Sequence, residues 1–378
     1  HLARAGHEDA SSPRALALAD LVAGDGSDAA QAEALFGSST HAPEAFSEHE
    51  RRVAAALAGR VLDDPAMPDA VRLEYPAWLD GSLRAAFGDR LAAEMEALNR
   101  PAPLDLRVNT IKATRDDARA ALAAEGIDAE PTPLSPWGLR VAGAARVGHA
   151  RAFKEGLVEI QDEGSQLAAL LVGARPGMTV VDYCAGAGGK TLALAAAMSE
   201  GGRLRGRLIA CDSSLERLGR MIPRLARAGA EGVERVVLAD DAAPALADPR
   251  GADRVLLDVP CSGSGAWRRD PLAKWRLTPE TLADLRARQR RILDAAAALV
   301  RPGGRLVYVT CSIFPEENEI PVAAFAAATE NFRIVPVGQV RNEILGGKPS
   351  DGDQFLRLSP AADGTDGFFI AALERTSA

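Results

Sequence analysis

The sequence predicts an α/β fold built on a doubly wound, mostly parallel sheet with helices on both faces. From about residue 156 onward, short apolar runs typical of buried strands alternate with longer stretches whose apolar residues have helical spacing. This alternation favours repeated strand–helix–strand units, which cover both faces of a parallel sheet. We expect strands at 179–183, 208–211, 235–239, 254–257 and 306–309, two late strands at 332–337 and 368–373, and helices at 192–199, 215–228 and 279–300.

The region before this sheet is predicted to hold helices and a second, smaller α/β unit. Residues 15–21 and 50–62 carry apolar side chains at helical spacing, whereas 106–110 and 138–141 are typical of strands around a helix at 114–125. We therefore divide the chain into a helical N-terminal region at 1–98, a small α/β module at 99–155 and the main domain at 156–378.

Composition excludes several classes of protein. The chain has 378 residues, 47% of them hydrophobic, so it can bury a large core. It carries no apolar run long enough to cross a bilayer and no signal-peptide pattern, which predicts a cytoplasmic protein without a membrane partner. Four cysteines without CxxC spacing argue against a disulfide framework and a zinc site, so we expect free thiols and no metal.

Charged residues narrow the chemistry and the partners further. All five histidines precede residue 150, which excludes a Ser-His-Asp or Cys-His site built within the main domain. The net charge of −8 argues mildly against a nonspecific nucleic-acid binder, but the distribution of charge matters more than its total. Arginines cluster at 203–207, 217–227, 268–276 and 286–291, and such clusters form either solvated helix faces or a basic surface for phosphates.

Two cysteines stand where a ligand site is expected. Cys261 and Cys311 each follow an apolar run that predicts a buried strand, so both should lie at the carboxyl edge of the sheet, where open α/β sheets bind ligands. Two thiols that converge beside Asp258 suggest nucleophilic chemistry, in which one thiol attacks and the other helps to finish the reaction. Cys184 and Cys211 lack such a partner motif, and we expect them to be small buried hydrophobic residues.

A glycine-rich turn after the first predicted strand of the main domain is the candidate cofactor site. The segment VVDYCAGAGGKT at 180–191 predicts a strand, a turn and a helix start, which together favour a negatively charged ligand. A Walker A loop requires glycine where Cys184 stands, and a dinucleotide fingerprint requires glycine where Thr191 stands. S-adenosylmethionine is the third candidate, because its carboxylate can meet the amides of this turn.

Acidic residues end the next two predicted strands. Asp212 is well placed to accept hydrogen bonds from ribose hydroxyls, and Asp240 with Asp241 could accept from an adenine amino group. The alternative is that each acid only caps the helix that follows it. Together with Asp182, which ends the strand before the glycine-rich turn, acids stand at three successive strand ends, and this favours the cofactor interpretation.

Several motifs together resemble those of a known family. The segments DVPCSGSG at 258–265 and TCS at 310–312, followed by PEENE at 315–319, are similar to the two cysteine motifs of RsmB/Sun-type (NOL/NOP/Sun family) RNA (cytosine-5) methyltransferases. The resemblance runs from about Tyr75 to the C-terminus, and the pair of cysteine motifs is highly specific. The family carries Ala-Pro where this chain has Gly186-Ala187, so we expect a looser turn. Further similar segments are LRVNT at 106–110, QDEGSQ at 161–166, RRDP at 268–271 with Lys274-Trp275, and DGFF at 366–369.

The resemblance implies a Rossmann-like class I methyltransferase domain with a seven-stranded sheet, and it implies roles for the site residues. Cys311 is the nucleophile that adds to carbon 6 of cytosine and so activates carbon 5, while Cys261 assists loss of the carbon-5 proton and release of the enzyme. Asp258 binds the base at its N3 edge, and Lys190 either orients Asp258 or favours a thiolate through its charge. The implied residues for S-adenosylmethionine are Asp182, Cys184, Ala185, Gly186, Ala187, Gly188, Gly189, Lys190, Asp212, Arg217, Asp240, Asp241, Asp258 and Pro260.

The resemblance also implies the substrate. It favours ribosomal RNA over transfer RNA, bound with help from the small α/β module, which would be similar to an RNA-recognition motif. The target base must leave its stack, so single-stranded or loop RNA is expected, and the enzyme is expected to be a monomer. The alternatives are a catalytically idle RNA-binding ribosome assembly factor and a methyltransferase for a small molecule or a protein.

Four other residues have two interpretations each. Trp267 and Trp275 either stack on RNA bases or pack in the core. Arg107 and Asn109 either contact phosphates or only pin the small module.

Overall fold

The computed structural model describes residues 12–24, 26–37, 41–60, 64–239, 251–346 and 354–376. Its internal contacts divide the chain into two compact units, His1–Ala77 and Trp78–Ala378. Asp240 and Asp241, which were predicted to bind the cofactor, lie outside the described residues.

The first unit is built from short helices in the part that the structure describes. They are α1 (Pro13–Ala19), the π-helical turn η1 (Asp20–Gly24), α2 (Ala29–Ala34), α3 (Glu48–Leu57) and α4 (Asp69–Arg72). Asp28 and Ser47 begin α2 and α3 through capping boxes, which satisfy amides that a first turn leaves free. Leu18, Val22 and Leu57 are among the buried side chains that form the core of this unit.

The second unit contains a small antiparallel sheet with strand order β2-β3-β1-β4. The strands are β1 (Asp105–Val108), β2 (Ala129–Pro131), β3 (Gly138–Val141) and β4 (Val158–Ile160), and the helices α7 (Arg115–Ala123) and α8 (Arg151–Lys154) belong to the same region, with the short turn η4 (Val147–His149) between β3 and α8. Leu106, Leu122 and Leu139 pack together in its core. The predicted boundary placed β4 in the main domain, but β4 pairs with β1, so the small sheet continues beyond residue 155.

The main sheet of the described residues confirms the predicted doubly wound, Rossmann-like fold and has eight strands where seven were expected. In the described residues it has the continuous strand order β12-β14-β11-β10-β5-β8-β9, and β13 pairs with β14 beside this path. Strands β9, β8, β5, β10 and β11 run parallel, whereas β14 is antiparallel to its neighbours. The bounds are β5 (Thr179–Asp182), β8 (Arg207–Asp212), β9 (Glu234–Val237), β10 (Ala252–Asp258), β11 (Val300–Thr310), β12 (Phe332–Val335), β13 (Leu356–Leu358) and β14 (Phe368–Arg375).

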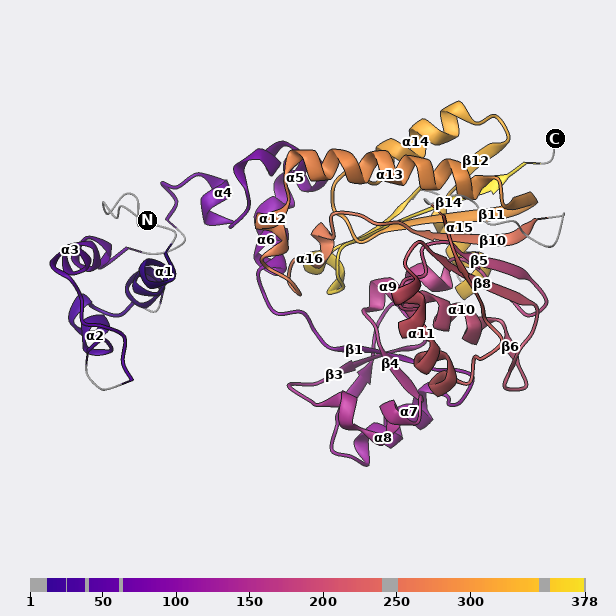
Figure 1. Cartoon of the computed structure of the whole chain (residues 1–378), viewed down its shortest axis with the longest axis horizontal. Helices are drawn as coiled ribbons and strands as arrows, with labels where there is room; N and C mark the ends of the chain where they lie inside the picture. Colours follow the sequence, from indigo (N-terminus) through magenta and orange to yellow (C-terminus); the bar gives the residue numbers. More distant parts are fainter. Residues whose placement is uncertain are drawn as a thin grey trace. The chain divides into compact units, whose positions relative to one another are not determined.

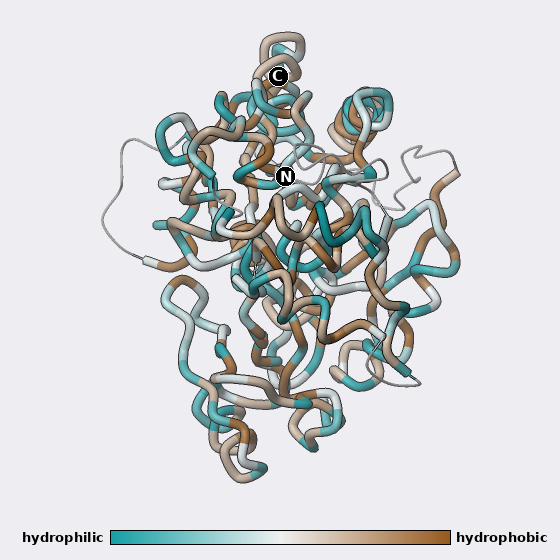
Figure 2. Tube along the Cα trace, turned by 90° about the vertical axis from the view of Figure 1, so that its left-hand side faces the viewer, coloured by the Kyte–Doolittle hydropathy of each residue, from teal (hydrophilic) through white to brown (hydrophobic). Residues whose placement is uncertain are grey.

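Helices cover both faces of this sheet (Figure 1). The helices α9 (Glu163–Leu170), α10 (Gly189–Ala197), α11 (Leu215–Ala228) and α15 (Val337–Leu345) pack on one face, and α13 (Pro279–Ala297) and α14 (Glu319–Ala328) pack on the other. Successive strand residues alternate between the two cores: Val180 joins the first and Val181 the second. Figure 2 shows hydrophobic and hydrophilic stretches following one another along the trace.

Shorter elements complete the second unit. They are η2 (Ala77–Leu79), α5 (Asp80–Phe87), η3 (Gly88–Arg90), α6 (Leu91–Leu98), the hairpin of β6 (Ser199–Glu200) with β7 (Arg203–Leu204), η5 (Ser264–Ala266), α12 (Ala273–Arg276) and α16 (Pro360–Asp363). Within the described ranges, none of the helices combines the length and the apolar character that crossing a bilayer requires.

Candidate active site

The turn between β5 and α10 brings the backbone close to a cavity. Two of its glycines have left-handed backbone angles, with φ of +56° at Gly186 and +87° at Gly188. A Cβ added to Gly188 would lie 2.5 Å from Met221 Cγ, so this glycine allows α11 to pack against the turn. A Cβ added to Gly186 would meet no atom of the described residues within 4 Å, so this position faces open space.

This turn lacks the Ala-Pro dipeptide of the resembled family, and hydrogen bonds hold its shape instead. Gly188 N donates to Ala185 O at 2.9 Å, and Gly186 N donates to Asp212 Oδ2 at 2.9 Å. Asp212 also accepts from Ser214 N at 2.8 Å, and Ser214 is the N-cap of α11. The Asp212 carboxylate therefore joins the turn after β5 to the start of α11, and its predicted contact with ribose stays a prediction.

A cavity of about 550 Å³ lies beside this turn at the carboxyl edge of the sheet. Arg220, Arg288 and Gln161 are among its lining residues and were not in the predicted set of cofactor-binding residues. The predicted site residues that line it are Cys184, Ala185, Gly186, Ala187, Gly189, Lys190, Asp212, Arg217, Asp258, Pro260 and Cys261. The structure thus gathers residues from three strand ends around one space.

Asp182 is a correction to the predicted set of cofactor-binding residues. Its side chain is fully buried and accepts a hydrogen bond from Thr191 Oγ1 at 2.6 Å, so it supports the first turn of α10 and does not line the cavity. Burial raises the pKa of Asp182 to about 7, against the hydrogen bond from Thr191, which favours the charged form. A strand-end acid looks the same in the sequence whether it faces a ligand or a helix.

Lys190 and Asp258 form an ion pair at the edge of the cavity. Lys190 Nζ, from the first turn of α10, lies 2.6 Å from Asp258 Oδ2 at the end of β10, and 5.4 Å from the centre of the Phe368 ring. Burial by itself would lower the pKa of Lys190, but the attraction and hydrogen bond of Asp258, with the nearby Cys311 and Asp182, raise it. Lys190 therefore stays charged and orients Asp258.

The two cysteines meet in space, as their strand-end positions predicted. Cys261 Sγ and Cys311 Sγ lie 3.5 Å apart, and both side chains are partly exposed. The hydrogen bond with Cys311, followed by burial and the charge of Cys311, raises the pKa of Cys261 well above the usual value of a thiol. This shift favours the protonated form of Cys261.

The other two cysteines differ from one another. Cys211 is fully buried, and burial raises the pKa of its thiol to about 12, which fits its expected role as a small hydrophobic residue. Cys184 is only partly buried and lines the cavity.

Glu317 is a site residue that the sequence analysis missed. Its fully buried side chain accepts hydrogen bonds from Ser262 and Ser312, the residues that directly follow Cys261 and Cys311. The signal for this role is weak, because Glu317 stands in the acidic run PEENE, which is typical of an exposed helix start.

The small sheet is attached to the main domain next to the cavity. Arg107 Nη1, from β1, donates to Gly189 O at 2.7 Å and to Gln161 Oε1 at 2.7 Å. Arg107 is buried, and burial lowers the pKa of its guanidinium to about 10. Asn109 Nδ2 donates to Gly156 O at 2.8 Å and Ala228 O at 2.9 Å. Both side chains therefore pin the small sheet to the main domain and do not present a surface to phosphates.

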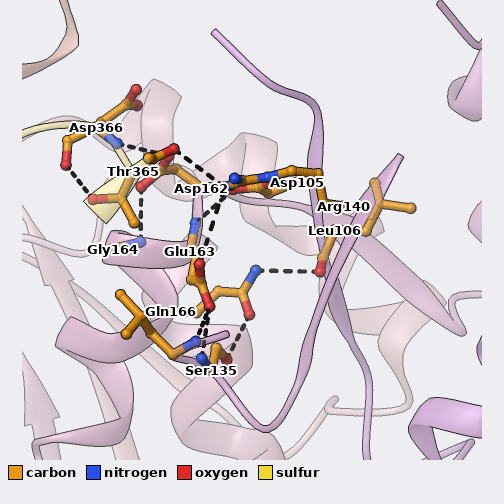
Figure 3. Close-up of polar contacts among 12 residues, drawn as sticks. Asp105, Leu106, Ser135, Arg140, Asp162, Glu163, Gly164, Gln166, Thr365 and Asp366 are labelled. Atoms are coloured by element: carbon orange, nitrogen blue, oxygen red, sulfur yellow. Dashed lines mark hydrogen bonds and ion pairs between the residues drawn. The ribbon is translucent and has the colours of Figure 1, made fainter. Parts of the chain in front are cut away.

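A buried polar network extends this attachment (Figure 3). Arg140 of β3 pairs with Asp105 of β1 at 2.7 Å, and Glu163 at the start of α9 accepts from Ser135 N at 2.7 Å. Asp162 accepts from Asp366 N at 3.0 Å, and burial together with the charge of Asp366 raises the pKa of Asp162. Segments from β1 to the residues before β14 are thus joined in one network.

The two tryptophans with open interpretations have different environments. Trp267 is 1% exposed and packs edge-on against Phe314, with ring centres 5.9 Å apart, so it belongs to the core. Trp275, on α12, is 54% exposed. Core packing explains Trp267 only.

Comparison with known proteins identifies the family. Residues 169–374 match the model of the 16S rRNA methyltransferase RsmB/F family. The chain belongs to this family. Residues 75–148 also match the ferredoxin-like domain of RsmF/B-like methyltransferases. The RsmB/Sun-type resemblance of the cysteine motifs is therefore confirmed.

Individual relatives of this RsmB/F family member agree with the assignment. Ribosomal RNA small subunit methyltransferase B of Salmonella arizonae is 34% identical over 314 residues, which are 83% of this chain and 69% of the relative. A methyltransferase homologue from Pyrococcus horikoshii has a TM-score of 0.68 at 27% identity, over 82% of this chain and 99% of that chain. The NSun6 structure from the same organism, solved with SFG, has a TM-score of 0.67 at 22% identity, over 80% and 99%, and shows the same fold.

The protein is thus an S-adenosylmethionine-dependent RNA methyltransferase, and its cavity fits that cofactor. A volume of about 550 Å³ lies in the range of small-molecule sites, which is roughly 300–1,000 Å³. The open space at Gly186 lets a ligand reach the backbone of the turn, where a side chain would fill it. Across the described ranges there is no cluster of three or more His, Cys, Asp or Glu side chains arranged to hold a metal ion.

Proposed function

We propose that this enzyme methylates carbon 5 of a cytosine in small-subunit ribosomal RNA through a covalent adduct on Cys311. The observation that carries this proposal is the 3.5 Å separation of the Cys261 and Cys311 sulfurs, beside the Lys190–Asp258 ion pair. Two adjacent thiols are needed when one forms a covalent bond with the base and the other helps to resolve it.

The chemistry requires a nucleophile on the protein, because carbon 5 of cytosine is too electron-poor to accept a methyl group unaided. The Cys311 thiolate adds to carbon 6, and the electron pair of the 5,6 double bond then makes carbon 5 nucleophilic. S-adenosylmethionine, when bound, supplies the electrophilic methyl group that carbon 5 accepts. Loss of the carbon-5 proton to a base then restores the double bond and expels Cys311 as a thiolate.

Cys261 and Asp258 have complementary roles in this proposal. Cys261 lies within hydrogen-bond reach of Cys311 and keeps its own proton, so it differs from the attacking thiol. After the methyl group is in place, Cys261 assists removal of the carbon-5 proton and release of the enzyme. Asp258 is held by Lys190 and contacts the N3 edge of the base, where it stabilises the adduct.

The cofactor would be held by the residues of the glycine-rich turn and its surroundings. The amides near Gly186 and Gly189 face the carboxylate, and Asp212 and Arg217 line the same cavity. We propose that the target base lies between this cavity and Cys311, which requires that the nucleotide leaves its stack.

The substrate proposal rests on the named relatives, which are small-subunit ribosomal RNA methyltransferases. We propose that the sheet of β1 to β4, spanning about 99–160, helps to bind that RNA. The proposed mechanism needs Cys261 and Cys311 as free thiols, so we propose a reducing compartment, the cytoplasm, as the place of action.

The experiment that tests the proposal traps the adduct. The Cys261→Ala variant is mixed with S-adenosylmethionine and small-subunit RNA that lacks its own methylation, and the mixture is resolved under denaturing conditions. We expect a protein–RNA band that disappears when Cys311→Ser is added to the same chain. Cys211→Ala is the matched control, because its thiol lies in the core, and it should give no stable band. A band that survives Cys311→Ser contradicts the proposed nucleophile.

A further inference from the structure

Glu317 lies under the two loops that carry the cysteines. Its Oε1 accepts from Ser262 N at 2.9 Å and from Gln289 Nε2 at 2.8 Å, while its Oε2 accepts from the hydroxyls of Ser262 and Ser312. The side chain is fully buried. One carboxylate therefore receives four hydrogen bonds from three different segments of the chain.

The positions of the two serines give this arrangement its meaning. Ser262 directly follows Cys261, and Ser312 directly follows Cys311, so the carboxylate joins the loops at the residues next to both thiols. Ser262 Oγ also lies 3.2 Å from Ser312 Oγ, and Gly265 N donates to Cys311 O at 2.9 Å. The bonds to Glu317 add to the other contacts between the two loops, in which Ser264 Oγ lies 3.1 Å from Ser312 Oγ and accepts from Ile313 N at 2.9 Å.

The rest of the segment anchors Glu317 itself. Tyr308 OH donates to Glu317 O at 2.8 Å, and Gln289 Nε2 reaches both the carboxylate and Pro260 O, the latter at 2.9 Å. Asn318 bonds to Thr310 Oγ1 at 2.5 Å and to Ser312 O at 2.9 Å. A buried carboxylate with this many donors is held rigidly, because each lost bond would leave a desolvated group without a partner.

We propose that Glu317 is a positioning residue that sets the distance and the relative orientation of the Cys261 and Cys311 thiols. It acts through Ser262 and Ser312 and does not itself touch the reacting base. This inference rests on the proposed covalent mechanism, which gives the spacing of the two sulfurs a catalytic meaning.

The charge of Glu317 supports the same division of labour. The hydrogen bond with Cys311 and burial are the largest causes that raise the pKa of Cys261, and the negative charge of Glu317 adds to them. Glu317 thus helps Cys261 to remain the protonated member of the pair.

The test compares Glu317→Gln with Glu316→Gln in the full chain. Glutamine keeps the size of the side chain but replaces one acceptor with a donor that faces hydroxyl and amide donors. Glu316 is the matched control, because its carboxylate accepts from Ser82 Oγ on α5 instead. We expect Glu317→Gln to bind S-adenosylmethionine with unchanged affinity and to show a kcat about 100-fold lower, the scale expected from misplacing a reacting group by about 1 Å. The KM for RNA should stay within a few-fold of wild type.

A second readout does not require turnover. Alkylation of Cys261 by iodoacetamide, followed by peptide mass spectrometry over a pH series without RNA, reports when this thiol ionises. We expect the alkylation profile of Cys261 in Glu317→Gln to move to lower pH than in Glu316→Gln. A role limited to stability would leave this profile unchanged in the folded protein.

The outcomes separate this inference from the proposed function. Equal kcat and equal alkylation profiles in the two variants overturn the positioning role. If wild-type protein forms no adduct with any RNA, the proposed function fails, while the alkylation profile still tests Glu317. If Glu317→Gln does not bind S-adenosylmethionine, the double variant Ser262→Ala with Ser312→Ala replaces it, and wild-type kcat in that folded variant overturns the inference.

Discussion

Lys190 Nζ and Asp258 Oδ2 lie 2.6 Å apart although 68 positions of the chain separate the two residues. Lys190 lies in the first turn of the helix after the glycine-rich turn, and Asp258 ends the strand that leads to Cys261. This single contact therefore connects the cofactor side of the candidate site with its thiol side. Strand β10, which ends at Asp258, and strand β5, which precedes the turn that leads to Lys190, are neighbours in the sheet.

Removing the charge of Lys190 is expected to free the Asp258 carboxylate from its present orientation. Lys190→Met should lower kcat by about 100-fold, because Asp258 loses the partner that orients it. Single-turnover methylation of RNA measures this effect, and circular dichroism verifies the fold. Lys112→Met is a control, since Lys112 Nζ donates to the backbone carbonyls of Glu155 and Arg227, and neither residue lines the cavity. Equal activity of the two variants would rule out a role for the ion pair.

Asp182 is expected to make stability depend on pH. Its pKa is about 7 in the folded protein against an ordinary value of 3.8, so the folded state binds more protons than the unfolded state between these values. Stability should therefore fall as pH rises through this window and stay at its lower level above it. Asp182→Asn should remove this dependence, and its advantage over wild type should grow by a few kcal/mol between pH 4 and pH 8. Denaturant unfolding of both proteins across this range measures the difference, and parallel curves would contradict the buried acid.

The two sulfurs at 3.5 Å are expected to join under mild oxidation. One equivalent of hydrogen peroxide takes one hydrogen from each thiol and yields two water molecules, while the sulfurs form a disulfide. Peptide mapping should show Cys261 bonded to Cys311, with loss of RNA methylation that dithiothreitol reverses. Cys211 is the internal comparison, because its buried thiol should remain free. Activity that survives quantitative oxidation would show that the thiols are not both required.

Arg107 is expected to affect cofactor binding from a distance. Arg107→Met removes the hydrogen bond from Arg107 to Gly189 O, so the dissociation constant for S-adenosylmethionine should rise about 10-fold, which corresponds to roughly 1.4 kcal/mol. Isothermal titration of the cofactor measures this change. Arg146→Met serves as the control, since Arg146 is exposed on the same small module. Unchanged affinity in Arg107→Met would mean that the turn holds its shape without this bond.

The sequence predicted best the elements whose signal is local. β11 carries a long apolar run that is buried on both faces, and the glycine-rich turn has its own composition. β2 and β4 span three residues each, which is too short for a recognisable pattern. Strand order depends on pairings over long sequence distances, so nothing near β14 indicates that it pairs with both β11 and β12.

In the candidate site, too, local sequence signals could be predicted and contacts between distant segments could not. The proximity of Cys261 and Cys311 could be predicted, because both follow strands and the carboxyl ends of parallel strands lie at the same edge of a sheet. The burial of Asp182 against Thr191 and the bridge through Glu317 depend on how loops turn back on one another. Sequence periodicity does not indicate such contacts between loops. Motifs therefore identify the reacting residues more readily than the residues that position them.

The place of β14 in the main sheet has a consequence for synthesis. β14 follows every other described strand in sequence, yet it lies between β12 and β11 and also pairs with β13. While the chain emerges from the ribosome, β11 therefore keeps a long unpaired edge until β14 has been made. Asp366, which accepts a hydrogen bond from Arg268 Nε at 2.6 Å, is synthesised equally late. A nascent chain therefore contains both Cys261 and Cys311 before β14 pairs with β11. We expect the unpaired edge of β11 to be the part of the sheet that most needs a chaperone.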